Sequence, residues 1–146
     1  MFAGSHQLSV DDKGRIAIPA RFRVALTELC DSQLVITRGP NPCLEIYPLP
    51  EFERIVRDIQ QMEDRAIAES LKQVFVGFAV ETEIDKAGRV LLSPMLRKYV
   101  PLEGAAVLMG QDTRFDLWSQ AQWDARFGEG SNLQASLADA FRTLRR

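Results

Sequence analysis

The alternation of apolar and polar residues predicts two short strands around a polar turn, and the chain carries this arrangement twice. Residues 6–11 alternate as in a half-buried strand, and the apolar run 16–18 follows the turn. Residues 80–84 alternate in the same way before the apolar run 90–92. The repeat indicates a chain folded as two matched halves, each presenting the same turn.

A short helix is predicted after each strand pair, over 19–26 and 93–100. Each has a proline in its first turn, a position that tolerates this residue well, and Ser93 is expected to cap the second helix. Two further apolar strands are predicted in each half, at 34–37, 44–47, 107–110 and 115–118. Each half therefore reads strand, turn, strand, helix, strand, strand, helix.

Between the halves, apolar residues at helical spacing predict an amphipathic helix over 50–76, with a break near 62–64. Its apolar stripe is expected to pack on the core, and a separate partner-binding helix is the minor alternative. After the loose segment 128–131, four apolar residues form a sparse helical seam: Leu133, Leu137, Phe141 and Leu144. The sequence leaves open whether this tail is a frayed terminus, a helix docked on its own chain, or a contact to a neighbouring subunit.

These elements predict an α+β fold in four parts. Residues 1–50 and 77–127 form the two halves, 51–76 is a helical linker packed on the core, and 128–146 is a tail that is partly helical or disordered. A four-stranded unit with one short helix buries little apolar surface alone, so the halves are expected to share a core.

Composition is ordinary for a globular protein, but charge is unevenly distributed. The 146 residues are 46% hydrophobic and 26% charged, with a net charge of −2, which argues against nucleic-acid binding. The segments that contain the repeated turn are nevertheless basic: 1–26 carries four cations against two carboxylates, and 85–98 four against one. Residues 51–70 carry six carboxylates against three arginines. The average therefore hides a dipolar layout.

Other features of the sequence bear on the cellular compartment of the protein and on whether it is an enzyme. The apolar runs are too short to cross a bilayer, and residues 1–6 lack a secretion signal, so we expect a cytoplasmic protein with no membrane partner. Cys30 and Cys43 have no metal-ligand or redox spacing and are expected to be plain thiols. The one histidine, His6, is expected to be a partly exposed strand residue. No hydrolase, P-loop or zinc-protease motif is present, so we expect no catalysis, cofactor or metal.

The repeated turn carries the candidate chemistry. Asp11-Asp12-Lys13-Gly14-Arg15 returns 74 residues later as Asp85-Lys86-Ala87-Gly88-Arg89. The glycine allows a positive φ, the aspartate can accept backbone amides, and the arginine suits phosphate or the guanine edge. A purely structural role is equally open, because the aspartate and arginine could simply pair or join the two halves.

At these residues the chain resembles the MraZ family, whose members carry two AbrB-type swapped-hairpin motifs. The aspartate-x-x-x-arginine pattern occurs twice with the correct flanks. Four further segments resemble the family: Met1-Phe2-x-Gly4, Pro42-Cys43-Leu44, Tyr47-Pro48-Leu49-Pro50 and Phe115-Asp116-Leu117-Trp118. The resemblance extends to about Phe127 and leaves 128–146 uncovered.

The resemblance implies a double-split β-barrel with added helices. It also implies a nucleoid-associated bacterial transcriptional regulator of the division and cell-wall gene cluster. Similar proteins form ring-shaped homo-oligomers and bind tandem G-rich repeats in double-stranded promoter DNA. Carried over by position, the DNA contacts are Arg15 and Arg89, with Lys13 and Lys86 beside them, and Asp11, Gly14, Asp85 and Gly88 shape the turns. The loops differ at two aligned positions, so the second is expected to contribute less to DNA binding, or differently.

A single turn offers too few contacts for a tight specific site, whereas a ring repeats the contact against tandem DNA repeats. The competing interpretation is an antitoxin-like or scaffold module that uses the same hairpin fold to bind protein. Such antitoxins usually have one motif copy and a disordered tail, while this chain has two copies and a short tail. The identity of the bound partner, DNA or protein, separates the two interpretations.

Overall fold

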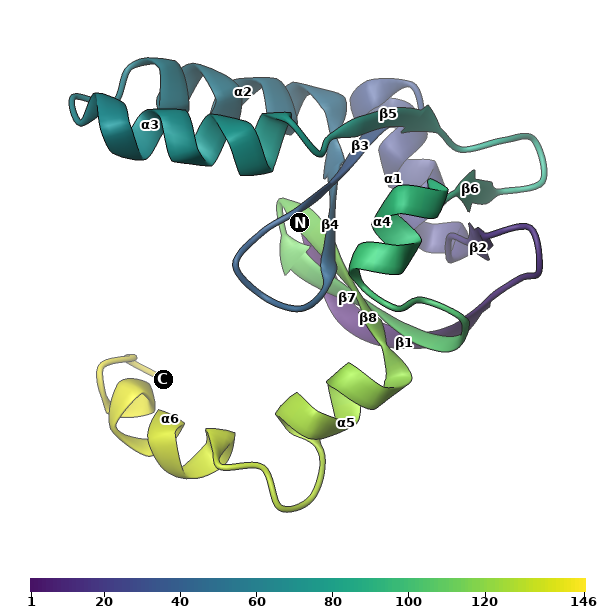
Figure 1. Ribbon diagram of the computed structural model, residues 1–146. Coiled ribbons are helices and arrows are strands. Elements are labelled where there is room, and N and C mark those ends of the chain that lie inside the picture. The colour runs from purple at the N-terminus through teal and green to yellow at the C-terminus, as the bar shows by residue number, and fades with distance from the viewer.

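The computed structural model describes all residues, 1–146, and shows a mixed α+β fold with a six-stranded antiparallel sheet. The strand order in this sheet is β1-β7-β8-β4-β3-β5, and β2 pairs with β6 in a separate two-stranded ladder (Figure 1). The strands are β1 (Phe2–Val10), β2 (Arg15–Ala17), β3 (Gln33–Arg38), β4 (Leu44–Pro48), β5 (Val80–Glu83), β6 (Arg89–Leu91), β7 (Gly104–Asp112) and β8 (Arg114–Ser119).

The helices fall into three groups. α1 and α4 each follow a strand of the small ladder, α2 and α3 form a hairpin that continues into a π-helical segment, and α5 and α6 extend from the end of β8 (Figure 1). Their bounds are α1 (Ala20–Cys30), α2 (Leu49–Gln60), α3 (Arg65–Leu71), η1 (Lys72–Val76), α4 (Pro94–Tyr99), α5 (Gln120–Phe127) and α6 (Leu133–Arg142).

The two halves are interleaved rather than placed side by side. In the large sheet, β1 pairs with β7, β3 with β5, and β4 with β8, so strands of one half repeatedly lie against strands of the other. The amide of Ile18 donates to the carbonyl of Gly88, and the amide of Leu92 donates to the carbonyl of Gly14. Each turn is therefore fixed to the strand that follows the other turn.

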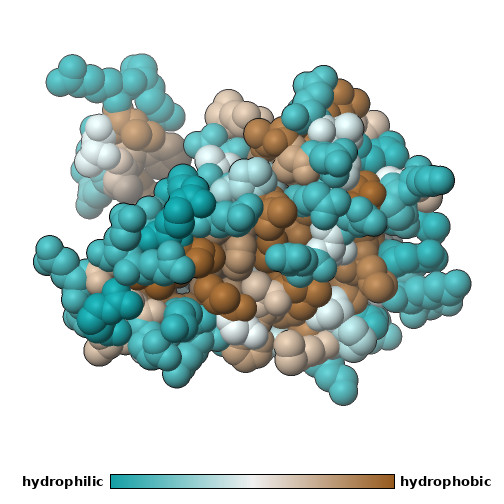
Figure 2. Space-filling view, turned by 90° about the horizontal axis from the view of Figure 1, so that it is seen from above, coloured by the Kyte–Doolittle hydropathy of each residue, from teal (hydrophilic) through white to brown (hydrophobic).

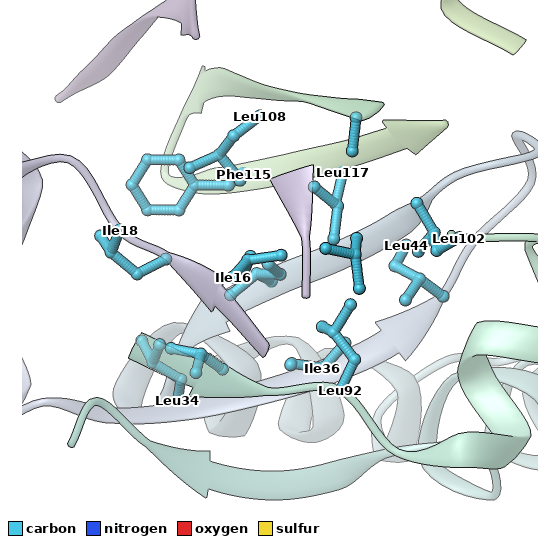
Figure 3. Close-up of a cluster of buried hydrophobic side chains, with 14 of the residues drawn as sticks. Ile16, Ile18, Leu34, Ile36, Leu44, Leu92, Leu102, Leu108, Phe115 and Leu117 are labelled. Atoms are coloured by element: carbon cyan, nitrogen blue, oxygen red, sulfur yellow. The ribbon is translucent and has the colours of Figure 1, made fainter. Parts of the chain in front are cut away.

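The interleaving produces one main core, drawn from both halves (Figure 3). Ile16 and Val90 face each other across the small ladder and are fully buried. They pack with Leu34, Leu108 and Phe115 of the large sheet. Burial of each such side chain contributes about 1.5–3 kcal/mol, so both halves contribute to the stability of this one core.

A second, smaller cluster lies under the helical hairpin. Its buried members are Tyr47, Ile59, Ala68 and Phe75. The hydroxyl of Thr37 on β3 donates to the carbonyl of Phe75 at 2.7 Å and so satisfies both groups inside the cluster. Apolar residues of the linker thus lie against Tyr47 of β4, beside Thr37 of β3.

The predicted elements are confirmed with shifted boundaries. β1 begins at Phe2, four residues before the predicted strand, because its first residues pair with the far end of β7. The single helix predicted over 50–76 is divided into α2, α3 and η1, and the break falls where expected. Asp64 caps α3 by accepting the amide of Ile67 at 3.1 Å. Ser93 caps α4 as predicted, since its hydroxyl accepts the amide of Leu96 at 3.3 Å.

The tail forms a helix that is not packed into the body. None of the residues of α6 is buried, and the helix stands apart from the rest of the molecule in the view from above (Figure 2). The same view shows hydrophilic side chains at the opposite end, where the two turns lie in Figure 1. The chain contains no helix with both the length and the apolarity that crossing a membrane requires.

Candidate nucleic-acid interface

The two repeated turns have the same backbone geometry. In each, the glycine amide donates to the aspartate carbonyl, at 3.0 Å for Gly14 and Asp11 and 2.9 Å for Gly88 and Asp85. The aspartate amide in turn donates to the arginine carbonyl at 2.9 Å in both copies. The glycines have φ values of +84° and +80°, a conformation that side chains with a Cβ adopt at a cost. The sequence repeat is therefore a repeat of shape.

The aspartate carboxylates stabilise the turns by accepting hydrogen bonds from backbone amides. Oδ1 of Asp11 accepts the amides of Lys13 at 3.0 Å and Arg15 at 2.8 Å, and Oδ1 of Asp85 accepts the amide of Arg89 at 2.9 Å. The bond from the Arg15 amide is the main reason why the pKa of Asp11 lies below its ordinary value. These aspartates therefore stabilise the backbone of the turns.

The two arginines differ in their side-chain partners. Nε of Arg15 donates to Oδ2 of Asp11 at 2.9 Å, which makes an ion pair within the first turn. Arg89 makes no such pair with Asp85, and its buried Nε has no hydrogen-bond acceptor in the chain. The structural alternative, in which aspartate and arginine pair, thus describes the first turn but not the second.

The ladder places both arginines on one outer face. Arg15 lies opposite Leu91 and Arg89 lies opposite Ala17, while Ile16 between them points into the core. Arg15 and Arg89 are consequently diagonal neighbours, and the Cα atoms of such neighbours in an antiparallel pair lie roughly 7–8 Å apart. Both turns project from the same side of the molecule (Figure 1). One ligand can therefore contact both.

Two more arginines, absent from the sequence prediction, cross from one half to the other. The guanidinium of Arg97 on α4 covers Gly14, and a Cβ there would lie 2.6 Å from its Cζ. Arg23 on α1 covers Gly88 in the same way. A sequence signal existed, because these arginines are also 74 residues apart and each follows its motif arginine by eight residues. Each turn thus needs glycine for a second reason, to leave room for the crossing arginine.

The surface around the turns has excess positive charge. Lys13 and Lys86 are exposed at the turns, while Arg15 and Arg89 are half-buried. Seven cations stand against four carboxylates: Lys13, Arg15, Arg23, Lys86, Arg89, Arg97 and Lys98 against Asp11, Asp12, Asp85 and Glu103. Nε of each crossing arginine is buried without an acceptor. The uncompensated charge suits an anionic ligand.

The remaining candidate groups are the acidic side chains, the two cysteines and the histidine. No group of three or more histidine, cysteine, aspartate and glutamate side chains is placed to hold a metal ion. Cys30 and Cys43 are free thiols, and burial raises the pKa of Cys43 to about 12. His6 is half-buried, with Nε2 3.1 Å from Nη2 of Arg21. These contacts explain His6 as a structural strand residue.

Comparison with known proteins identifies the family. The sequence matches the family model described as "MraZ protein, putative antitoxin-like" twice, over residues 1–75 and 74–146, so that each match contains one turn. A protein of Thiobacillus denitrificans called "Transcriptional regulator MraZ" is 42% identical over 130 residues, which cover 88% of each chain. A protein of the same name from Acidovorax sp. is 39% identical over 142 residues, covering 97% of each chain. The resemblance found in the sequence is confirmed, and the chain belongs to the MraZ family.

Proposed function

We propose that this protein is a transcriptional regulator that binds double-stranded promoter DNA through its two turns. Relatives over nearly the whole chain carry the name of a transcriptional regulator, which supports the regulatory role. The observation that carries the DNA contact is the common outer face of Arg15 and Arg89, flanked by the cations around them. The gene cluster for division and the cell wall is the proposed target.

The side chains on this face have complementary tasks. The planar guanidinium of Arg89 has no carboxylate partner and suits a bidentate contact with O6 and N7 of guanine. Arg15 keeps its terminal nitrogens for the same purpose, while Asp11 holds Nε and sets the direction of the group. Lys13, Lys86 and the crossing arginines suit phosphate contacts, which position the protein without reading sequence.

One pair of turns is too small for tight binding, so we propose that a ring-shaped homo-oligomer repeats the contact along tandem DNA repeats. Each added subunit then binds at a high effective concentration, which multiplies weak contacts. About four phosphate contacts per subunit predict roughly a hundredfold loss of affinity between 50 and 200 mM salt. We also propose that the sheet and the small ladder together correspond to the double-split β-barrel implied by the resemblance.

Binding to the DNA upstream of the protein's own gene tests this function. Fluorescence anisotropy would compare a fragment with tandem repeats, a fragment with one repeat, and a scrambled fragment, at several salt concentrations. We expect binding to the tandem fragment, steep salt dependence and much weaker binding to one repeat. Equal affinity for one repeat and for the tandem array would contradict the avidity account. A protein that co-purifies at fixed ratio, with no DNA binding, would support the antitoxin-like or scaffold module instead.

A further inference from the structure

A groove of about 760 Å³ lies between the helical hairpin and the β3–β4 loop, far from the two turns. We call it the α3 groove. One wall is apolar and is formed by Ala66, Ile67, Leu71, Val74 and Phe75. Ile67 is 50% exposed and Leu71 is 41% exposed, although both are large aliphatic residues. An exposed apolar wall of this kind is typical of a contact site.

Two buried carboxylates at the α3 groove share one guanidinium. Glu45 and Arg114 line the groove and Asp116 lies beside Arg114, and both carboxylates are only 4% exposed. The other cation of the lining, Arg38, stacks on the ring of Tyr99 instead. Nε of Arg114 lies 2.9 Å from Oδ1 of Asp116, but Nη2 lies 3.9 Å from Oε2 of Glu45. The hydroxyl of Tyr47 donates to the other oxygen of Glu45 at 2.7 Å. Two buried carboxylates with one guanidinium would be balanced by a second cation.

The chain itself contains a segment that matches this groove in both respects. α6 and the residues just after it bear the apolar seam Leu133, Leu137, Phe141 and Leu144, which we call the tail seam, and the first two of these are half-buried. Phe141 is 45% exposed and Leu144 is 56% exposed. Three arginines lie at the end of the tail seam, at 142, 145 and 146, of which Arg142 is paired with Asp139 of the same helix. An apolar ridge with a cationic end thus faces solvent.

The two surfaces also match in length. The groove wall from Ala66 to Val74 and the tail seam from Leu133 to Phe141 each cover nine residues, which is eight steps along a helix. At a rise of 1.5 Å per residue, both are about 12 Å long. The hairpin that borders the groove is acidic, with six carboxylates against three arginines over 51–70, while the tail end is basic. Docking of the tail seam on the groove wall would therefore also bring the basic tail end close to the acidic hairpin.

The link between α5 and α6 directs the tail away from its own groove. Ser131 donates its hydroxyl to the carbonyl of Arg126 at 2.7 Å and accepts the amide of Leu133 at 3.1 Å. Its own amide donates to the carbonyl of Gly128 at 3.2 Å. These bonds fix a turn that points α6 outward, clear of the body (Figure 2). The groove of another copy is then the accessible partner.

We propose that α6 of one copy docks in the α3 groove of a second copy. The tail seam packs on the apolar wall, and an arginine of the tail end balances the two buried carboxylates. Since a tail leaves each copy and a groove receives one, the contact is head-to-tail and can repeat around a closed ring. The inference deepens the ring assembly proposed above and rests on it, but it does not depend on the DNA contact.

Sedimentation velocity of full-length variants over a range of concentrations tests the docking. The tail variant is Leu137→Glu with Phe141→Glu, and the groove variant is Leu71→Glu. All three sites are partly or largely exposed, so the fold should persist, which circular dichroism checks. Ala135→Glu, on the opposite exposed face of α6, is the matched control. We expect the concentration for half assembly to rise at least tenfold for the tail and groove variants and to stay unchanged for the control.

Mixing the two assembly-deficient variants gives a second readout. The groove variant keeps a working tail and the tail variant keeps a working groove, so the mixture should form pairs of twice the 16.5 kDa chain mass by native mass spectrometry. Absence of such pairs, or wild-type assembly by either variant, would overturn the docking. If the tail and groove variants form the same rings as the wild-type protein, the docking proposal is wrong but the ring proposal stands. If the wild-type protein does not assemble at any concentration, both proposals are wrong.

Discussion

The two turns share one backbone but differ in the freedom of their arginines. Arg15 is held by an ion pair with Asp11, whereas Arg89 has no carboxylate partner. The sequence predicted that the second turn contributes less to DNA binding, or differently, because Asp12 aligns with Lys86 and Lys13 with Ala87. Side-chain geometry favours the opposite order for the arginines, since a guanidinium without a carboxylate keeps its full charge for a ligand. A duplicated shape therefore does not imply duplicated chemistry.

Separate arginine substitutions should show this difference most strongly. We expect Arg89→Ala to weaken binding to tandem DNA by about 10- to 100-fold, the loss typical of a base-contacting arginine. Arg15→Ala should cause a smaller loss of binding together with a slight loss of stability, because it also breaks the pair with Asp11. Anisotropy and denaturant unfolding measure the two effects. Arg57→Ala, which removes an exposed cation on α2, is the control, and an equal effect of all three changes would remove the distinction.

The glycines test whether the crossing arginines matter to binding. Alanine at Gly14 or Gly88 should cost about 1–2 kcal/mol through its positive φ and should also displace Arg97 or Arg23. Gly104→Ala is a matched control, since Gly104 has φ +71° but no atom within 4 Å of an added Cβ. All three variants should lose similar stability, as measured by urea unfolding. Only the two turn variants should lose DNA affinity, and retention of that affinity would show that the crossing arginines do not contribute.

Removing the crossing arginines themselves should have a smaller and less selective effect. We expect Arg23→Ala and Arg97→Ala each to weaken binding to specific and scrambled DNA alike, because phosphate contacts carry no sequence information. Each change should reduce the slope of log affinity against log salt by about 1. Titrations at four or more salt concentrations measure this slope. A loss confined to the specific fragment would assign these arginines to base contact instead.

Acid should loosen the first turn by a small amount. The pKa of Asp11 is lower in the folded chain than its ordinary value of 3.8, so its contribution to stability is present above that value and is lost as the pH falls through the lower, folded pKa. Carboxyl-carbon NMR shifts of Asp11 between pH 2 and 6 report the midpoint. Asp11→Asn, which cannot ionise, should remove this pH dependence. A midpoint at or above 3.8 would contradict the hydrogen-bonding pattern found for the turn.

Local patterns predicted local structure well. The strands around Ile16 and Val90, the Ser93 cap and the break before Arg65 all depend on residues within a few positions of one another, and the structure confirms them. The long reach of β1 to Phe2 was not predicted, because its cause is pairing with β7, a strand about a hundred residues away.

The predicted site was incomplete for the same reason. Motif matching found Arg15 and Arg89, but Arg23 and Arg97 reach the turns only because the halves interleave, and strand alternation does not reveal that arrangement. The constant 74-residue offset contained this information once the repeat was extended into the helices. The unequal pairing of the two arginines has no local sequence signal, since both turns have the same aspartate-to-arginine spacing.

The most direct test of the two-turn account is DNA binding by the double variant Arg15→Ala with Arg89→Ala, compared with each single variant. Native mass spectrometry would record the assembly state of every sample alongside its affinity for the tandem repeats. The account predicts that the double variant assembles as the wild-type protein does but binds specific DNA no better than scrambled DNA. Specific binding that survives in the assembled double variant would contradict it.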